Sequence, residues 1–239
     1  LGNTKNYEYD AQGRLTAVIL PAVTHPDTQV TVRPGYEYFY DEYGNRTAIR
    51  DNVVWINGTK TYDHDGNSGN GDDYRETLFT YDDFGNQLTR ELPMGQTESF
   101  EYDEETLRLI LHTDFEGNIT ESVYSDFGFL DELRYYEPGS DPNVDSPDEV
   151  VDYTYNSLDQ RSQISDARGD TDYTYDEFDR LVQVDTPEGT LNYEYDNYGR
   201  QVRKSIGDPA DPTHDWTYSY DALGRLKTVT TVRGHGVDL

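Results

Sequence analysis

The sequence contains no cysteine, so disulfide bonds and thiol chemistry are excluded and the redox compartment is left open. No segment is long and apolar enough to predict a membrane-spanning helix, and hydrophobic residues make up only 33% of the chain. Basic residues are also few, since 19 Lys and Arg face 48 Asp and Glu, for a net charge of −29. Because nucleic acids and anionic membranes are bound through Lys and Arg, this charge disfavours both classes of partner.

Patterns typical of catalysis are lacking as well. There is no G-x-S-x-G elbow and no phosphate-binding glycine loop, and the five histidines have no zinc-type spacing. Asp63, Asp65 and Asn67 have the alternating oxygen ligands of a calcium loop. However, an EF-hand would need Gly and Glu where this chain has Ser68 and Tyr74. We therefore predict a non-enzyme without a cofactor, and we favour a solvated loop over a metal site at these three residues.

A repeated phrase dominates what the sequence does contain. YTYDEFDRL at 173–181 and YEYDNYGRQ at 193–201 agree in Tyr-x-Tyr-Asp and in a later Arg, and related phrases recur at a basic interval of 20 to 22 residues. Three proline-rich insertions lengthen the interval, at 21–35, 137–149 and 207–215, and we predict loops there because proline cannot donate to a strand ladder. The tyrosines that anchor the phrases are Tyr9, Tyr40, Tyr62, Tyr81, Tyr102, Tyr124, Tyr155, Tyr175, Tyr195 and Tyr220.

Each phrase predicts a β-hairpin. Its two aromatic residues stand two positions apart, which places both rings on one face of a strand and not on one face of a helix. The Asp that follows can accept a backbone hydrogen bond, and the closing Gly tolerates the positive φ of a three-residue loop. Asp159 and Asp179 replace that Gly, and Asp also enters the left-handed region. Thr106 stands at another such position, so we predict an inserted residue there.

The structural residues of these hairpins follow from the same pattern. They are the anchoring Tyr, the Asp after it and the closing Gly, namely Tyr9, Asp10, Gly13, Tyr40, Asp41, Gly44, Tyr81, Asp82, Gly85, Tyr175, Asp176, Tyr195, Asp196, Gly199, Tyr220, Asp221 and Gly224.

The predicted fold class is all-β, with tandem β-hairpin repeats forming a long antiparallel sheet strip. No segment shows a sustained 3.6-residue period, so we expect almost no helix. Wide open sheets curl, close or split, and the small apolar content argues against a thick sandwich, so we expect the strip to twist and wind into a partial shell or spiral. Residues 1–239 are interpreted as a single array of about ten repeats, cut from a longer chain because the text begins and ends within repeats.

The aromatic residues leave two interpretations open. In the first, each repeat's tyrosines pack against those of the next repeat. In the second, an exposed row of rings stacks on sugars. Aromatic residues inside turns are candidates for contact with a ligand, namely Tyr43, Phe84, Phe127, Phe178 and Tyr198. Trp55 and Trp216 lie beside loops, and each is a candidate to anchor either a ligand or the loop itself.

Four phrases resemble the YD repeat, which is also called the RHS repeat. They are YEYDAQGRL (7–15), YTYDEFDRL (173–181), YEYDNYGRQ (193–201) and YSYDALGRL (218–226). The family pattern is Tyr-Asp, two variable residues and Gly-Arg-Leu, followed by a D-P-x-G turn that DTPEG at 185–189 resembles with one extra residue. The match is looser at 62–68, 102–108, 124–130 and 155–161. Such repeats occur in Rhs polymorphic toxins, in cocoon-forming subunits of insecticidal toxin complexes, in wall-associated proteins and in teneurins.

The resemblance implies a function as well as a fold. In that family the repeats form a strip that spirals into a hollow shell, often around a toxic C-terminal domain. It therefore implies a secreted or cell-surface scaffold whose partners are the rest of its parent chain and an encapsulated toxin domain. The alternative is an adhesion module that binds cell-surface glycans or a partner through exposed aromatic residues. DPADP at 208–212 is not followed by Gly-Leu, so the family's self-cleavage motif is not carried over.

Overall fold

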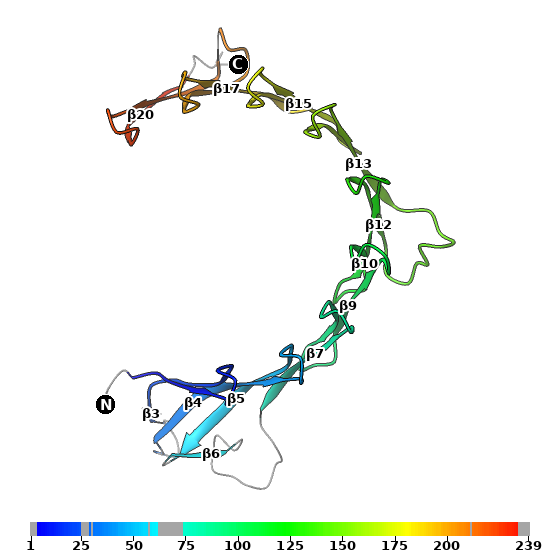
Figure 1. Ribbon diagram of the computed structural model, residues 1–239, viewed down its shortest axis with the longest axis vertical. Coiled ribbons are helices and arrows are strands. Elements are labelled where there is room, and N and C mark those ends of the chain that lie inside the picture. The colour runs from blue at the N-terminus through cyan, green and yellow to red at the C-terminus, as the bar shows by residue number, and fades with distance from the viewer. Residues whose placement is uncertain are drawn as a thin grey trace. The chain divides into compact units, whose positions relative to one another are not determined.

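The computed structural model describes residues 4–24, 29, 31–56, 58–61, 74–210 and 212–233. In these ranges every regular element is a β-strand and there is no helix (Figure 1). Consequently, this part of the chain offers no helix with the length and hydropathy needed to cross a membrane. The chain divides into unit 1, Leu1–Ile119 with Glu137–Gly139, and unit 2, Thr120–Tyr136 with Ser140–Leu239.

Unit 1 is an antiparallel sheet built from hairpins. Most strands pair with the next strand in sequence, while β2 also pairs with β4 and β5 with β7, past the short strands β3 and β6. The strands are β1 (Asn6–Tyr9), β2 (Leu15–Ile19), β3 (Val23–Thr24), β4 (Thr31–Tyr40), β5 (Arg46–Ile56), β6 (Thr59–Thr61), β7 (Arg75–Tyr81), β8 (Gln87–Glu91), β9 (Thr97–Tyr102) and β10 (Leu109–Thr113). A further strand, β11 (Ile119–Tyr124), begins at Ile119, the last residue of the longer segment of unit 1, and its other residues belong to unit 2.

Unit 2 is a plain antiparallel meander. From β12 to β20 each strand pairs with the next strand in sequence. The strands are β12 (Leu130–Tyr136), β13 (Glu149–Tyr155), β14 (Arg161–Asp166), β15 (Gly169–Tyr175), β16 (Leu181–Thr186), β17 (Gly189–Tyr195), β18 (Gln201–Ile206), β19 (His214–Tyr220) and β20 (Leu226–Arg233). The predicted all-β fold of tandem hairpins in an antiparallel sheet is confirmed.

Most turns after the Tyr-Asp phrases of the described residues have the predicted three-residue geometry. At 196–200 the Asp196 N–H donates to the Arg200 carbonyl at 2.9 Å, and Gly199 takes a φ of +79°. Asp159 and Asp179 take the same left-handed conformation, with φ of 61° and 62°. The turn at 103–108 is one residue longer, and Leu107 occupies its left-handed position.

The prediction of a loop over the whole of 21–35 is wrong. Val23–Thr24 forms β3, and 31–35 is the first half of β4, where Pro34 lies opposite Val54 of β5. Proline is tolerated there because the hydrogen bond at this position uses the Pro34 carbonyl, which accepts from the Leu20 N–H at 2.7 Å, and needs no N–H from Pro34. The insertions at 137–149 and 207–215 also end in strand, since Glu149 begins β13 and His214 begins β19.

An apolar core lies where β2, β4 and β5 meet in unit 1. Its buried members are Ala17, Ile19, Val53 and Trp55, with Tyr74 packed against them. Gly35 lets the strands approach, because a Cβ at this position would lie 2.2 Å from the Val18 carbonyl oxygen and 2.8 Å from the Trp55 ring. In unit 2, by contrast, the buried apolar side chains among the described residues are Tyr136 and Val184.

Candidate functional site

Seven of the anchoring tyrosines link their repeat to an earlier one. The Tyr195 hydroxyl donates to the carbonyl of Leu181, the first residue of the preceding returning strand, at 2.8 Å. The same bond recurs at distances of 2.7 to 3.0 Å along both units. The pairs are Tyr40–Leu15, Tyr81–Arg46, Tyr102–Gln87, Tyr155–Leu130, Tyr175–Arg161, Tyr195–Leu181 and Tyr220–Gln201.

The arginine that closes a turn completes this link, and we call the combination the clasp. Arg180 forms an ion pair with Asp176 of its own turn at 2.6 Å. Its guanidinium carbon lies 4.8 Å from the ring centroid of Tyr195 in the next repeat, and its Nη1 donates to the Asp196 carbonyl at 3.2 Å. Clasps of the same form join Arg14 to Tyr40 and Arg200 to Tyr220.

Other residues can stand at the arginine position. Asn45 and Asn86 bind the carboxylates of Asp41 and Asp82 at 3.0 and 2.9 Å. Phe129 instead places its ring 4.9 Å from that of Tyr155, which lies in the next repeat. The prediction that tyrosines pack mainly on tyrosines therefore misses the main partner, because a guanidinium stacks on an aromatic face and also reaches a carboxylate.

The electrostatics of the clasp hold the turn carboxylates ionised. The hydrogen bond from the Arg180 side chain is the main cause that lowers the pKa of Asp176, and the Arg200 side chain lowers the pKa of Asp196 in the same way. Burial raises the pKa of Tyr195, whose ring lies beneath Arg180. These shifts favour the ionised carboxylate of the ion pair and the neutral form of the phenol.

The turn tips carry the aromatic residues that were predicted to contact a ligand. Tyr43, Phe84, Phe178 and Tyr198 are each between 68% and 85% exposed, and Phe127 is exposed as well. Clefts lie between successive turns. One of about 400 Å³ is lined by Phe178, Arg180, Tyr195, Asp196, Asn197 and Gly199, and one of about 550 Å³ is lined by Asp82, Asp83, Phe84, Leu88, Tyr102, Asp103, Glu104 and Leu107.

The two tryptophans do not lie with this row. Trp55 is 7% exposed and belongs to the core of unit 1, so its prediction as a ligand-facing residue is wrong. It is buried because it packs in the core with Ile19 and Val53. β5 continues to Ile56, where a loop was expected beside the ring. Trp216 lies in β19, half-buried, and stacks on His214 with ring centroids 5.7 Å apart.

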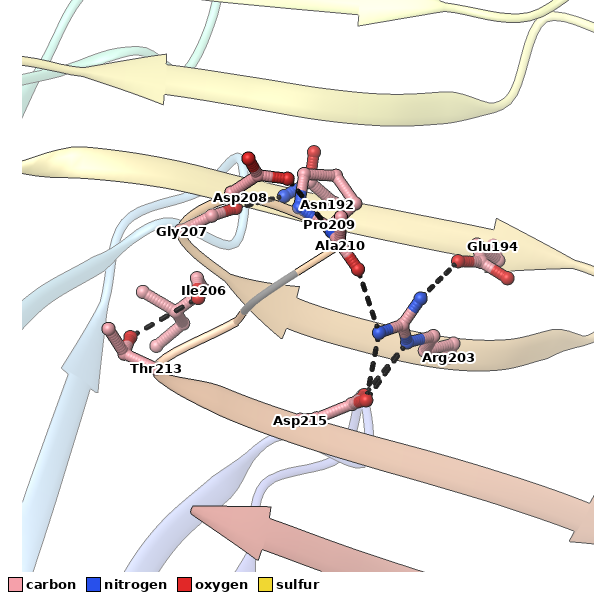
Figure 2. A network of polar contacts seen from close by, with 10 residues as sticks. All are labelled: Asn192, Glu194, Arg203, Ile206, Gly207, Asp208, Pro209, Ala210, Thr213 and Asp215. Atoms are coloured by element: carbon pink, nitrogen blue, oxygen red, sulfur yellow. Dashed lines mark hydrogen bonds and ion pairs between the residues drawn. The ribbon is translucent and has the colours of Figure 1, made fainter. Parts of the chain in front are cut away.

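The loop between β18 and β19 is tied down by one arginine (Figure 2). Arg203 binds the Asp215 carboxylate with Nε and Nη2 at 2.9 Å, the Glu194 carboxylate with Nη1 at 2.9 Å and the Pro209 carbonyl at 3.1 Å. These carboxylates raise the pKa of Arg203, which is charged in any case. A strand arginine bonded to a loop of the acidic insertion is a structural contact that nothing in the repeat phrase signals.

No group of His, Asp and Glu side chains within the described ranges has the geometry of a metal site. The calcium candidates Asp63, Asp65 and Asn67 lie outside the described residues. The clasp was only partly visible in sequence, because the Tyr-Asp…Arg spacing is local whereas the stacking of Arg on Tyr connects residues 15 to 26 positions apart in the examples above.

Part of the repeat array matches a known family model. Residues 155–191 match the family model of the RHS Repeat, beginning in a repeat whose phrase departs from the pattern. No curated protein matches the chain.

Several solved structures are similar to the chain at low identity. The Tc holotoxin pore of Photorhabdus luminescens shares 15% identity over 98% of this chain and 17% of that chain, with a TM-score of 0.41. TcdB2–TccC3 shares 14% over 98% and 18%, also with a TM-score of 0.41. A porin-like protein from Bacteroides uniformis shares 10% over 88% and 92%, with a TM-score of 0.35. The chain thus spans less than a fifth of either toxin chain. The identification comes from the family model, which confirms the predicted resemblance: this chain carries an RHS repeat at 155–191.

Proposed function

We propose that this chain is a non-catalytic structural segment of a secreted or cell-surface RHS-repeat protein, in which it forms part of the wall of a shell around a toxin domain. The observation that carries the proposal is the recurrence of one hydrogen bond, from the anchoring Tyr of one repeat to the returning strand of the repeat before. A bond repeated in this way lets each hairpin support its neighbour, as in other repeat arrays.

The hydrogen bonds and ion pairs that engage the turn carboxylates support a scaffold rather than an enzyme. The turn carboxylates of the clasps are occupied by arginine, asparagine and backbone N–H groups. A catalytic acid or base needs a pKa near the working pH, whereas the pKa values of Asp176 and Asp196 are lowered and that of Tyr195 is raised. Each shift moves the pKa of the group further from neutral pH.

The encapsulating role can be tested in the full parent chain by limited proteolysis. A toxin domain enclosed by the repeats should resist an added protease, and Arg180→Ala with Arg200→Ala should make it sensitive by loosening two clasps. Substitution of the exposed Arg168, whose ion pair with Asp166 lies within one turn, is the matched control and should leave protection unchanged. Equal digestion of the domain in all three proteins would remove the proposed shell.

The secreted or cell-surface location is tested separately, by fractionation of the source cells. Recovery of the parent chain in the medium or on the cell surface is expected, and exclusive recovery from the cytosol would contradict this part of the proposal.

A second candidate function is binding of a glycan or a protein partner along the turn tips. The exposed rings of Phe178 and Tyr198 favour it, since aromatic faces stack on sugars and large exposed apolar groups often mark interaction sites. Each ring has an internal partner as well, because Arg180 and Arg200 lie 5.2 Å from the ring centroids.

A glycan array decides whether the turn tips bind sugars. Signals that the wild-type chain gives and that Phe178→Ala with Tyr198→Ala loses would support binding, while Trp216→Ala serves as the control away from the tips. An array without signals for the wild-type chain would dispose of this function.

A further inference from the structure

The clasps of unit 2 hold each guanidinium against two rings. The guanidinium carbon of Arg180 lies 5.2 Å from the ring centroid of Phe178, in its own turn, and 4.8 Å from that of Tyr195, in the next repeat. Arg200 repeats the arrangement with one ring of its own turn and one of the next repeat. The chain therefore shows twice which chemical group fits between the turns of adjacent repeats.

One cleft of unit 1 has the same two rings but a different residue at the arginine position. Phe84 and Tyr102 line a cleft of about 550 Å³ between the turns at 82–86 and 103–108. We call this cleft the open clasp. Asn86 stands where the clasps have arginine, and its amide binds the aspartate of its own turn at 2.9 Å. Its short side chain ends at that bond and brings no cation to the ring of the next repeat.

The electrostatics of the two tyrosines show the same difference. Burial raises the pKa of Tyr102, and the charge of Asp82 adds to the rise. Burial raises the pKa of Tyr195 as well, but there the charge of Arg180 opposes the rise. In the part of the chain that the structure describes, no cation thus lies over the Tyr102 ring.

Carboxylates surround the open clasp. Four acidic residues line it, namely Asp82, Asp83, Asp103 and Glu104. The first and third are engaged within their own turns. The side chains of Asp83 and Glu104 are exposed and form no hydrogen bond or ion pair with any described residue. Aromatic walls beside free carboxylates are the surroundings in which a guanidinium is bound most strongly.

A backbone acceptor completes the comparison. In the clasp of Arg180, the Asp196 carbonyl accepts from Nη1 at 3.2 Å and also from the Gly199 N–H at 3.0 Å. The Asp103 carbonyl stands at the equivalent position of the open clasp and accepts from the Leu107 N–H at 2.9 Å. Since a carbonyl oxygen has two lone pairs, it can accept a further donor in the same way.

We propose that the open clasp binds an arginine side chain of a second polypeptide, with the guanidinium stacked on Phe84 and Tyr102 and paired with Asp83 or Glu104. Arginine fits better than lysine, because its planar fork stacks on a ring and donates to oxygens at the same time. The net charge of −29 attracts a basic segment and steers it to the surface. This inference gives the second candidate function one specific protein partner. It rests on the cleft alone, so neither a glycan array without signals nor a digested toxin domain would overturn it.

The first experiment titrates the chain with blocked Gly-Arg-Gly tripeptide in physiological salt, which screens long-range attraction. Peptides with lysine or citrulline at the centre are the controls, since lysine keeps the charge without the planar fork and citrulline keeps the shape without the charge. Amide NMR shifts of 82–88 and 102–107 should saturate with the arginine peptide, and both control peptides should bind about tenfold more weakly. Signals of 196–199, where Arg180 already contacts both rings, should not move.

Two outcomes of the titration would overturn the proposal. Shifts that do not saturate would show that the cleft holds no arginine side chain. Equal affinity for the arginine and lysine peptides would reduce the effect to the attraction of any cation by an acidic chain.

The second experiment supplies the arginine from within the chain. Asn86→Arg should close the clasp and abolish binding of the arginine peptide. Asn118→Arg is the matched control, because Asn118 binds the aspartate of its turn at 2.8 Å in the same way but belongs to a turn that does not line the cleft. The control should bind the peptide as the wild-type chain does. Loss of binding in both variants, or in neither, would overturn the proposal.

A further variant leaves the hydrogen bonds of both turns intact. Asp83→Asn with Glu104→Gln removes two charges at exposed positions, so the sheet should be retained, as circular dichroism can check. Its affinity for the arginine peptide should fall by about tenfold. An unchanged affinity would contradict the pairing of the guanidinium with these carboxylates.

Discussion

Two parts of the molecule hold a β-sheet together by different means. Where β2, β4 and β5 meet in unit 1, long strands bury an apolar core around Val53 and Trp55. In unit 2 the hairpins from β15 to β18 bury little apolar surface and are joined by the clasps of Arg180 and Arg200. The comparison teaches that repeats with few apolar residues can still couple to their neighbours through a polar link that recurs along the sheet.

The unfolding of each part can be followed by the fluorescence of one tryptophan. It has two tryptophans, of which Trp55 lies in the core of unit 1 and Trp216 in β19 of unit 2. Emission from chains with a single tryptophan, prepared with Trp216→Phe or Trp55→Phe, therefore follows the unfolding of each unit separately.

The largest effect is expected from Gly35→Ala in unit 1. The added Cβ would lie 2.2 Å from the Val18 carbonyl oxygen, a backbone atom that cannot move without breaking strand pairing. Overpacking of this kind costs about 3 kcal/mol or more of unfolding free energy. Denaturant unfolding followed by Trp55 measures it, and Trp216 emission should change little.

Gly95→Ala is the matched control for Gly35→Ala. Its φ of +85° is unfavourable for alanine, but no atom lies within 4 Å of the added Cβ. We expect a cost of about 1–2 kcal/mol from the left-handed backbone alone. Equal costs at the two glycines would show that the close packing of β2, β4 and β5 is not what stabilises unit 1.

In unit 2 the corresponding change is Tyr195→Phe, which removes a hydroxyl and keeps the ring. The bond to the Leu181 carbonyl is lost, so the unfolding free energy followed by Trp216 should fall by about 1 kcal/mol. Tyr198→Phe, at an exposed turn tip, should have no measurable effect. A fall of the same size in both variants would contradict a specific role for the hydroxyl between repeats.

The contribution of stacking is isolated by comparing Arg200→Ala with Arg225→Ala. Both arginines bind an aspartate four residues earlier, and within the described residues Arg200, unlike Arg225, lies over a ring of a following repeat. Arg200→Ala should therefore destabilise unit 2 by about 0.5–1 kcal/mol more than Arg225→Ala. Identical losses would assign the effect to the ion pair within the turn.

The smallest effect is the pH dependence of the clasp. The pKa of Asp196 is lowered in the folded chain, mainly by the hydrogen bond from the Arg200 side chain. Its stabilisation is thus present above the unfolded pKa of about 3.9 and is lost as the pH falls through the folded value. The Tm difference between the wild-type chain and Asp196→Asn should be constant from neutral to mildly acidic pH and shrink below about pH 4. A difference that is constant to the lowest pH would contradict this.

The repeat phrase was sufficient to predict the hairpins, because their determinants are local. Asp at the head of the turn, a residue with positive φ at its close and two rings on one face are all read from neighbouring positions, and Asp159 and Asp179 adopt the conformation expected of them. The added residue in the turn at 103–108 was visible for the same reason.

The remaining features depend on residues far apart in sequence. Pro34 was interpreted as a loop residue, since whether a strand needs its N–H depends on its neighbours in the sheet. The burial of Trp55 depends on Gly35, about twenty residues away, which admits the ring. The placement of Arg180 over Tyr195 follows from strand register, which the phrase alone does not define.

The most direct test of the account is a double-mutant cycle on Arg200 and Tyr220, with Arg200→Ala and Tyr220→Leu measured by denaturant unfolding. If the clasp couples adjacent repeats, the two losses should depend on each other by about 0.5–1.5 kcal/mol. The control pair, Arg180 and Tyr220, lies in repeats that are not adjacent and should be additive. Losses at Arg200 and Tyr220 that add to within about 0.3 kcal/mol would show that the repeats are held together without the clasp.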